Sequence, residues 1–97
     1  MEIEWDEAKR QATLLKHGVD LLVAARIFED WTLDKPDRRA DYGEPRTISL
    51  GMVGGECYVV VHTVRGSSLR IITAWKGGTR DRQRYSASLA GRAQGHG

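Results

Sequence analysis

The sequence predicts a single α+β domain in which two helices precede an antiparallel sheet and one helix follows it. Helical periodicity occupies the first 30 residues, and the alternation of apolar and polar residues typical of strands runs from about residue 46 to residue 75. Helices and strands that are segregated along a chain in this way indicate an α+β fold. With 97 residues, the chain has room for one domain with a small core, since such chains bury about 60–70% of their unfolded surface.

The first two predicted helices form a helical hairpin. Asp6 is a suitable N-cap for a helix that runs to about His17, and Gly18 supplies the left-handed residue that ends it. Asp20 then caps a second helix to about Phe28, because the apolar residues that follow recur at the spacing of one helical face. Only two residues separate these helices, so we expect them to pack closely.

Three or four strands are predicted next, as an antiparallel meander. Asp34 and Pro36 end the first strand, and residues 37–45 form a loop that is dense in charge. The glycines at 54–55 favour a two-residue hairpin, and residues 65–67 form a second tight turn. The predicted strands span residues 31–33, 46–53, 57–64 and 69–75.

The last predicted helix runs from Arg80 to about Leu89, with Thr79 as its N-cap. The domain therefore spans residues 1–89, and the small, polar residues 90–97 are expected to form a frayed tail. No apolar run approaches the roughly 18 residues of a membrane-spanning helix, and the acidic start lacks the apolar segment of a secretion signal. A single cysteine, Cys57, excludes an internal disulfide, so we expect a cytoplasmic protein.

Several kinds of chemistry find no support in the sequence. His17, His62 and His96 are scattered and no CxxC occurs, so we expect no metal site. No dinucleotide-binding glycine motif or P-loop is present, and we expect no cofactor. A serine or cysteine nucleophile and a pair of catalytic carboxylates are also without support.

The charge is divided unequally between the two parts of the chain. Residues 1–44 carry 7 basic and 11 acidic side chains, whereas residues 45–97 carry 8 basic and 2 acidic side chains. Seven of those 8 basic residues are arginine, whose planar guanidinium suits phosphate. The asymmetry indicates a polyanionic partner such as a nucleic acid, with a dipolar surface that binds nothing as the alternative.

The basic residues of the second part predict a site that binds and cleaves a phosphodiester. Arg70 and Lys76 share a face of the last predicted strand, because side chains two apart point the same way, and Arg65 stands at the preceding turn. Arg80 and Arg84 are four apart on the last helix and share a face there. Guanidinium groups can stabilise the extra negative charge that develops when RNA is cut.

His62 is a candidate base or acid, since the pKa of a histidine ordinarily lies near neutrality. Each of these residues also has a purely structural interpretation. His62 can be a half-buried, hydrogen-bonded imidazole, and Tyr85 can anchor the last helix to the core. Trp75 can be a core aromatic, and the arginines can form the solvated surface of the sheet and helix.

Six short segments, taken together in their order and spacing, resemble those of a known protein family over about residues 2–86. They are residues 4–9, 16–19, 24–28, 37–46, 70–74 and 84–85. Together they resemble the BrnT family of toxins from bacterial type II toxin–antitoxin systems. The resemblance implies a RelE-like fold and a metal-independent ribonuclease that arrests growth. It also implies a BrnA-type antitoxin with a ribbon-helix-helix DNA-binding domain, through which the pair would repress its own operon.

By analogy with RelE-like nucleases, the resemblance implies catalytic roles for residues of the sheet and last helix. The predicted catalytic set is Arg65, Arg70, Lys76 and Tyr85, with His62 as a further candidate for proton transfer. Arg46, Arg80 and Arg84 would contact the flanking RNA backbone. One departure is Trp75, which stands where the family usually has a basic residue. Lys76 is one position further, which on a strand means the opposite face.

Two other functions remain open at this point. The chain could be a nucleic-acid-binding module without catalysis, which the departure at Trp75 favours. It could also be an interaction domain whose basic face binds an acidic antitoxin segment. RNA recovered intact from a tight, salt-sensitive complex would indicate the binding module.

Overall fold

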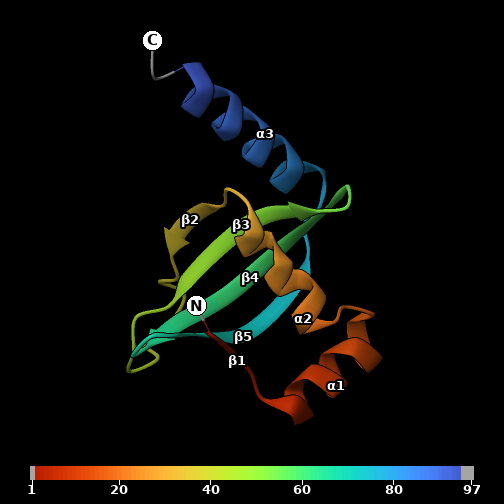
Figure 1. The fold of residues 1–97 in the computed structure, drawn as a ribbon, viewed down its shortest axis with the longest axis vertical. Coiled ribbons are helices and arrows are strands. Elements are labelled where there is room, and N and C mark those ends of the chain that lie inside the picture. Colours follow the sequence, from red (N-terminus) through yellow and green to blue (C-terminus); the bar gives the residue numbers. More distant parts are fainter. Residues whose placement is uncertain (1, 95–97) are drawn as a thin grey trace.

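The structure is a computed structural model that describes residues 2–94. It is an α+β fold, as the segregation of helices and strands predicted, and its sheet is mixed and has five strands (Figure 1). The helices are α1 (Glu7–His17), α2 (Leu21–Ala24), which continues as the 3-10 helix η1 (Ala25–Glu29), and α3 (Thr79–Gln94). The strands are β1 (Glu2–Glu4), β2 (Leu33–Pro36), β3 (Thr47–Val53), β4 (Glu56–Arg65) and β5 (Ser68–Lys76).

The first two helices begin and end where their capping residues predict. The side chain of Asp6 accepts a hydrogen bond from the Lys9 backbone N–H, and Gly18 ends α1 with φ 67°. Asp20 caps α2 and also receives the guanidinium of Arg10 from α1 at 2.8 Å. This ion pair ties the two helices together. The predicted second helix becomes a 3-10 helix over its latter part.

The sheet has the order β1-β5-β4-β3-β2. Strands β2 to β5 pair antiparallel in chain order, and β1 adds to β5 in parallel. The prediction lacked β1, because three residues are too few to show a periodicity. The sheet is therefore mixed and five-stranded rather than purely antiparallel with three or four strands. The RelE-like arrangement that the resemblance implies stays a prediction.

The strand β2 lies two residues later than predicted. It begins at Leu33 and includes Asp34 and Pro36, which were expected to end it. Proline has no N–H to donate, but β2 is the edge strand of the sheet and pairs only with β3, so the missing donor costs no hydrogen bond there. The hairpin between β3 and β4 is confirmed, with positive φ at both Gly54 and Gly55.

The last helix is longer than predicted. It continues through Gln94 rather than ending near Leu89, and Thr79 is its first residue rather than its N-cap. The predicted tail thus begins inside the helix, and residues 95–97, including His96, lie outside the described residues. Only the start of α3 lies near the sheet, and the rest projects away from it (Figure 1). Among the described residues, no helix is long and apolar enough to span a membrane.

The core lies on both faces of the sheet. Helices α1 and α2 with η1 cover one face, and the apolar residues between them and the sheet form the first cluster (Figure 1). The opposite face, called the second face below, carries another cluster that α3 joins through Tyr85. The buried residues of that cluster are Ile48, Leu50, Val59, Val61 and Tyr85. Much of the second face is therefore free of helices.

Candidate functional site

A β-bulge decides which basic side chains of β5 share a face. One residue, Ile72, has no partner on β4, so Ile71 and Ala74 both face the helices although they are three residues apart. Arg70 precedes Ile71 and lies on the second face, whereas Lys76 follows Ala74 by two and lies on the helix-covered face. Six residues also separate the two along the strand, roughly 20 Å. The predicted convergence of Lys76 with Arg70 is therefore wrong.

Basic residues from α1, from strands β4 and β5 and from the loop directly before β3 gather at the end of the second face where β3 begins and β4 ends. They line a cleft of about 250 Å³, called the arginine cleft below. Its lining residues are Asp6, Lys9, Glu44, Arg46, Arg65, Arg70, Ile71 and Ile72. The predicted proximity of Arg65 and Arg70 is thus confirmed, and Arg46 lies with them. Four cations against two carboxylates give the cleft an excess of positive charge.

A carboxylate links two of these arginines. Glu44 lies 3.3 Å from the guanidinium of Arg46 and 3.4 Å from that of Arg65. Arg46 is further held over the ring of Tyr42, 4.0 Å from its centroid. Arg70 makes no ion pair within residues 2–94. Glu44 therefore shows where an anion can contact two guanidiniums at once, and Arg70 offers a third cation beside them.

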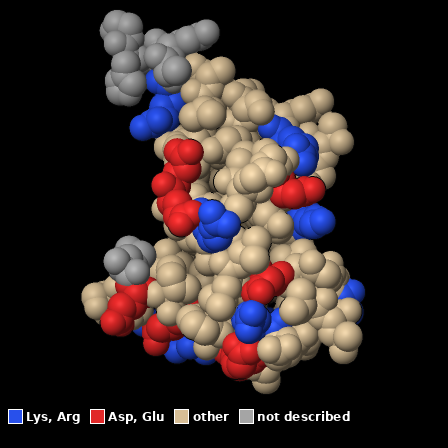
Figure 2. Space-filling model, turned by 45° about the vertical axis from the view of Figure 1, so that its right-hand side comes forward, with Lys and Arg blue, Asp and Glu red and all other residues tan. Residues whose placement is uncertain are grey.

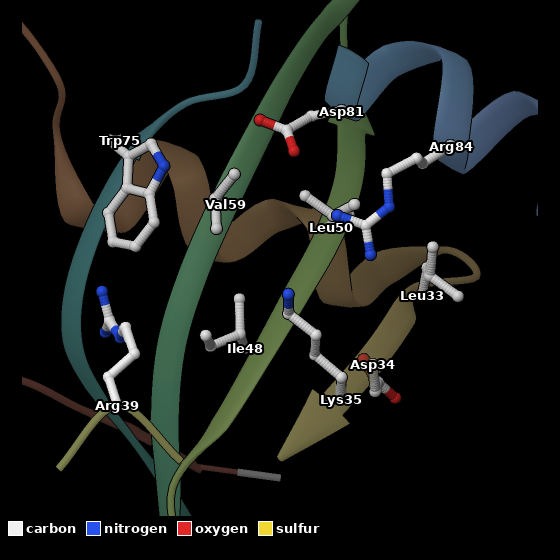
Figure 3. Close-up of a pocket in the computed structure, with 10 residues that line it drawn as sticks. All are labelled: Leu33, Asp34, Lys35, Arg39, Ile48, Leu50, Val59, Trp75, Asp81 and Arg84. Atoms are coloured by element: carbon white, nitrogen blue, oxygen red, sulfur yellow. The ribbon is translucent and has the colours of Figure 1, made fainter. Parts of the chain in front are cut away.

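A second cavity of about 260 Å³ lies on the same face, nearer to α3, and is called the tryptophan pocket below (Figure 3). It is lined by Leu33, Asp34, Lys35, Arg39, Ile48, Leu50, Val59, Trp75, Asp81 and Arg84. Apolar side chains of β3 and β4 form its floor, and the half-buried indole of Trp75 stands at one side. The basic groups of Lys35, Arg39 and Arg84 extend from β2, a loop and α3 around this floor (Figure 3).

The guanidinium of Arg39 is fixed in this pocket. Two of its nitrogens donate to the carboxylate of Asp37 at 2.8 Å, and this bonding holds the pKa of Asp37 at about 2. The same guanidinium lies 5.6 Å from the ring centroid of Trp75. Asp37 therefore orients a cation against the indole.

His62 lies in the interior rather than in either cavity. Its side chain is 8% exposed, faces the helix-covered side and meets the ring of Phe28 edge to face at 4.8 Å. Nε2 is 2.7 Å from the hydroxyl of Ser49, and burial lowers the pKa of the imidazole. The geometry therefore supports a structural role for His62, as a buried and hydrogen-bonded imidazole, rather than a role in proton transfer.

Tyr85 is also part of the core. It is 6% exposed, and its hydroxyl donates to the backbone carbonyl of Trp31 at 2.8 Å. The two rings are 5.4 Å apart, and burial raises the pKa of the phenol. Tyr85 therefore anchors α3 to the second face and lines neither cavity.

The remaining basic residues of the predicted site do not lie together. Arg84 lines the tryptophan pocket, whereas Arg80 and Lys76 are exposed and line neither cavity. The surface drawn in Figure 2 shows basic and acidic side chains interspersed rather than one continuous basic patch. Residues 2–94 contain no group of three or more side chains placed to hold a metal ion.

Sequence reasoning missed most of the tryptophan pocket. Lys35 and Arg39 come from the acidic part of the chain, so the charge asymmetry did not single them out. The unusual density of charge in the loop 37–45 was the available signal. Trp75 was interpreted as a core aromatic, although its departure from the family pattern marked the position. Lys9 was missed because only the fold brings α1 to the arginine cleft.

Comparison with known families adds one finding. Residues 5–81 match the family model described as the ribonuclease toxin BrnT of type II toxin–antitoxin systems. The matched region runs from the start of α1 to the first turn of α3 and contains most of the lining of both cavities. A search of curated proteins finds no match.

Proposed function

Because the chain belongs to the BrnT family of ribonuclease toxins from type II toxin–antitoxin systems, we propose that it cleaves RNA without a metal ion and that the arginine cleft holds the scissile phosphodiester. The observation that carries this proposal is the convergence of Arg46, Arg65 and Arg70 in one cleft. Two of them already hold a carboxylate there. A phosphate presents the same kind of anionic oxygens in the same fork geometry.

The chemistry assigned to this cleft is electrostatic. The 2′-hydroxyl of a ribose loses its proton to a base as it attacks the adjacent phosphorus, and the bond from phosphorus to the 5′-oxygen then breaks. The products are a 2′,3′-cyclic phosphate and a 5′-hydroxyl that takes its proton from water. Guanidinium groups aimed at the phosphorane stabilise the negative charge that it gains between these two steps. Arg65 and Arg70 take this role in the proposal, with Arg46 holding a flanking oxygen.

Proton transfer is assigned to a carboxylate rather than to the residues predicted for it. His62 and Tyr85 are buried and line neither cavity. Glu44 lines the cleft between two guanidiniums, where it can accept the proton of the attacking 2′-hydroxyl. In this proposal Glu44 forms ion pairs with Arg46 and Arg65 in the free protein. When the RNA phosphate takes its place beside the two arginines, the Glu44 carboxylate turns toward the ribose.

The test is RNA degradation by the purified protein in EDTA. We expect Arg65→Ala and Arg70→Ala each to lower the cleavage rate by about a hundredfold, the effect of removing one preorganised donor. Arg26→Ala is the matched control, because Arg26 is an exposed arginine on the helix-covered side that, within the described residues, pairs with Glu29 and lines neither the arginine cleft nor the tryptophan pocket. Lys76→Ala should lower the cleavage rate less than Arg70→Ala does, because Lys76 lies outside the cleft.

Three results would contradict the proposal. Cleavage that stops in EDTA would show a metal requirement. Equal rates for wild type, Arg65→Ala and Arg70→Ala would remove the arginines from the mechanism. RNA recovered intact from a tight, salt-sensitive complex would indicate the non-catalytic binding module.

We further propose that a BrnA-type antitoxin neutralises the protein by placing an acidic segment in the arginine cleft and that operator DNA is bound only through the antitoxin. The excess of positive charge in the cleft and the carboxylate already seated there support this arrangement. Co-expression with such an antitoxin should restore growth. Arg46→Ala combined with Arg65→Ala should weaken the complex, and an unchanged affinity would place the interface elsewhere.

A further inference from the structure

We propose that the tryptophan pocket binds one unstacked nucleobase of single-stranded RNA, with Trp75 as the stacking surface. The inference rests on the proposed function, because the RNA held in the arginine cleft would supply the base. It extends that function by a site that selects an unpaired nucleotide near the cleaved bond.

The shape and lining of the pocket suit a flat, apolar ligand. Its volume of about 260 Å³ is just below the usual range for small-molecule sites, so it takes one base rather than a longer ligand. Ile48, Leu50 and Val59 form an apolar floor, and the indole of Trp75 rises beside it (Figure 3). Every base has a π face, so stacking on an aromatic side chain requires no particular sequence.

The rim of the pocket suits the phosphates that any base carries with it. Lys35, Arg39 and Arg84 reach it from three separate elements (Figure 3). Arg39 is already paired with Asp37, but a purely apolar ligand would leave Lys35 and Arg84 without an ion-pair partner within residues 2–94. A free inorganic anion would leave the apolar floor exposed to water. A nucleotide, with a flat base and a charged backbone, matches both parts.

The position of the pocket allows one RNA strand to reach both cavities. Arg46 of the arginine cleft directly precedes β3, and Ile48 of the tryptophan pocket lies two residues further along the chain, roughly 7 Å away in extended backbone. Arg70 and Trp75 lie on the second face of β5. A short single strand can therefore cross this face with its phosphodiester at the arginines and a base at the indole.

The local structure keeps the pocket formed without RNA. Asp37 holds Arg39 by two hydrogen bonds, and this guanidinium stays 5.6 Å from the Trp75 ring. Tyr85 fastens α3 through its hydrogen bond to the Trp31 carbonyl, which places Arg84 at the rim. Such preorganisation lowers the entropic cost of binding.

The test measures binding of an RNA octanucleotide with 2′-O-methyl groups throughout, which prevents cleavage. We expect Trp75→Ala to weaken binding about tenfold and Trp75→Phe to restore most of the affinity, because one stacked base contributes on that order. Trp5→Ala is the matched control, a half-exposed tryptophan outside both cavities. Thermal unfolding of each variant shows whether it is folded at the temperature of the assay.

A set of octanucleotides with one abasic site at each position in turn assigns the effect to a base. An abasic site at one position should weaken binding to the wild-type protein by the same factor as Trp75→Ala weakens binding of the intact strand. The Trp75→Ala protein should then bind this abasic strand no more weakly than it binds the intact strand. Arg46→Ala should weaken binding to the intact and the abasic strands equally, because it contacts phosphate.

Other results would overturn the inference. If Trp75→Ala binds every strand like wild type while Arg65→Ala and Arg70→Ala bind weakly, the base site is wrong and the proposed function stands. If Trp75→Ala weakens only the complex with the antitoxin, the pocket is a protein-binding surface. If wild type neither binds nor cleaves RNA, the proposed function itself has failed.

Discussion

The hydroxyl of Ser49 lies 2.7 Å from Nε2 of His62 inside the helix-covered layer of the protein. The same hydroxyl donates its proton to Asp34 at 2.5 Å, so its oxygen accepts from the N–H at Nε2 of a neutral imidazole. Nδ1 is buried and has no hydrogen-bond partner within residues 2–94. This chain of bonds crosses three adjacent strands. A protonated His62 would add an N–H at Nδ1, which has no acceptor there, so the site favours the uncharged imidazole.

The neutral state of His62 makes stability depend on pH. Burial lowers the folded-state pKa of His62 below its ordinary value of 6.5, and the charge of Asp34 opposes this only in part. The unfolded state therefore binds more protons, and the unfolding free energy should fall as the pH drops below 6.5, by at most about 1.4 kcal/mol per pH unit. Urea titrations at several pH values between 5 and 7 measure how the unfolding free energy changes with pH. His62→Leu should flatten this part of the curve, and an unchanged slope would assign it to other groups.

Tyr85→Phe should lower stability by about 1 kcal/mol, because the variant loses the hydrogen bond from the phenol to the Trp31 carbonyl. The ring itself is retained, so packing against the second face is preserved. The measurement is the urea midpoint at pH 7. If cleavage is lost at a temperature where the variant is folded, the assignment of this phenol to proton transfer would be restored.

Glu44→Gln should separate RNA binding from RNA cleavage. Removal of the charge frees Arg46 and Arg65 from their carboxylate, so affinity for the 2′-O-methyl octanucleotide should rise several-fold. Cleavage of ordinary RNA should fall, because an amide cannot accept the 2′-hydroxyl proton. Glu29→Gln is the control, an exposed glutamate whose partner Arg26 lies outside both cavities. Wild-type cleavage by Glu44→Gln would exclude this carboxylate as the base.

Two glycine substitutions should change stability in opposite directions. A Cβ at Gly51 would lie 2.5 Å from the Cβ of Ile27, so Gly51→Ala should cost about 1–3 kcal/mol by pushing η1 away from β3. A Cβ at Gly91 meets nothing within 4 Å on α3, so Gly91→Ala should stabilise by up to about 1 kcal/mol. Thermal unfolding measures both, and a neutral Gly51→Ala would show that Ile27 can move.

Features governed by neighbouring residues were predicted well from the sequence. The caps at Asp6, Gly18 and Asp20 and the glycine hairpin between β3 and β4 lie where expected. These features depend on hydrogen bonds and backbone angles within a few residues. The strand β1 was missed, since its pairing with β5 depends on a segment more than 60 residues away.

The candidate site was predicted only in part. Arg65 and Arg70 do share a cleft, because a tight turn joins their strands. Lys76 does not join them, since the bulge at Ile72 adds one residue and exchanges the faces of the strand beyond it. A pattern of period two cannot reveal such an insertion in advance.

The sequence by itself determined the α+β class, both ends of α1, the start of α2 and the resemblance to a toxin family, because helix propensity, capping and spacing depend on residues near one another in the chain. Only the tertiary structure decided that Lys9 and Glu44 enter the arginine cleft and that Trp75 faces a pocket with Arg39. The physical reason is that a site is made of side chains from separate elements, and sheet register and helix packing alone set which of them meet.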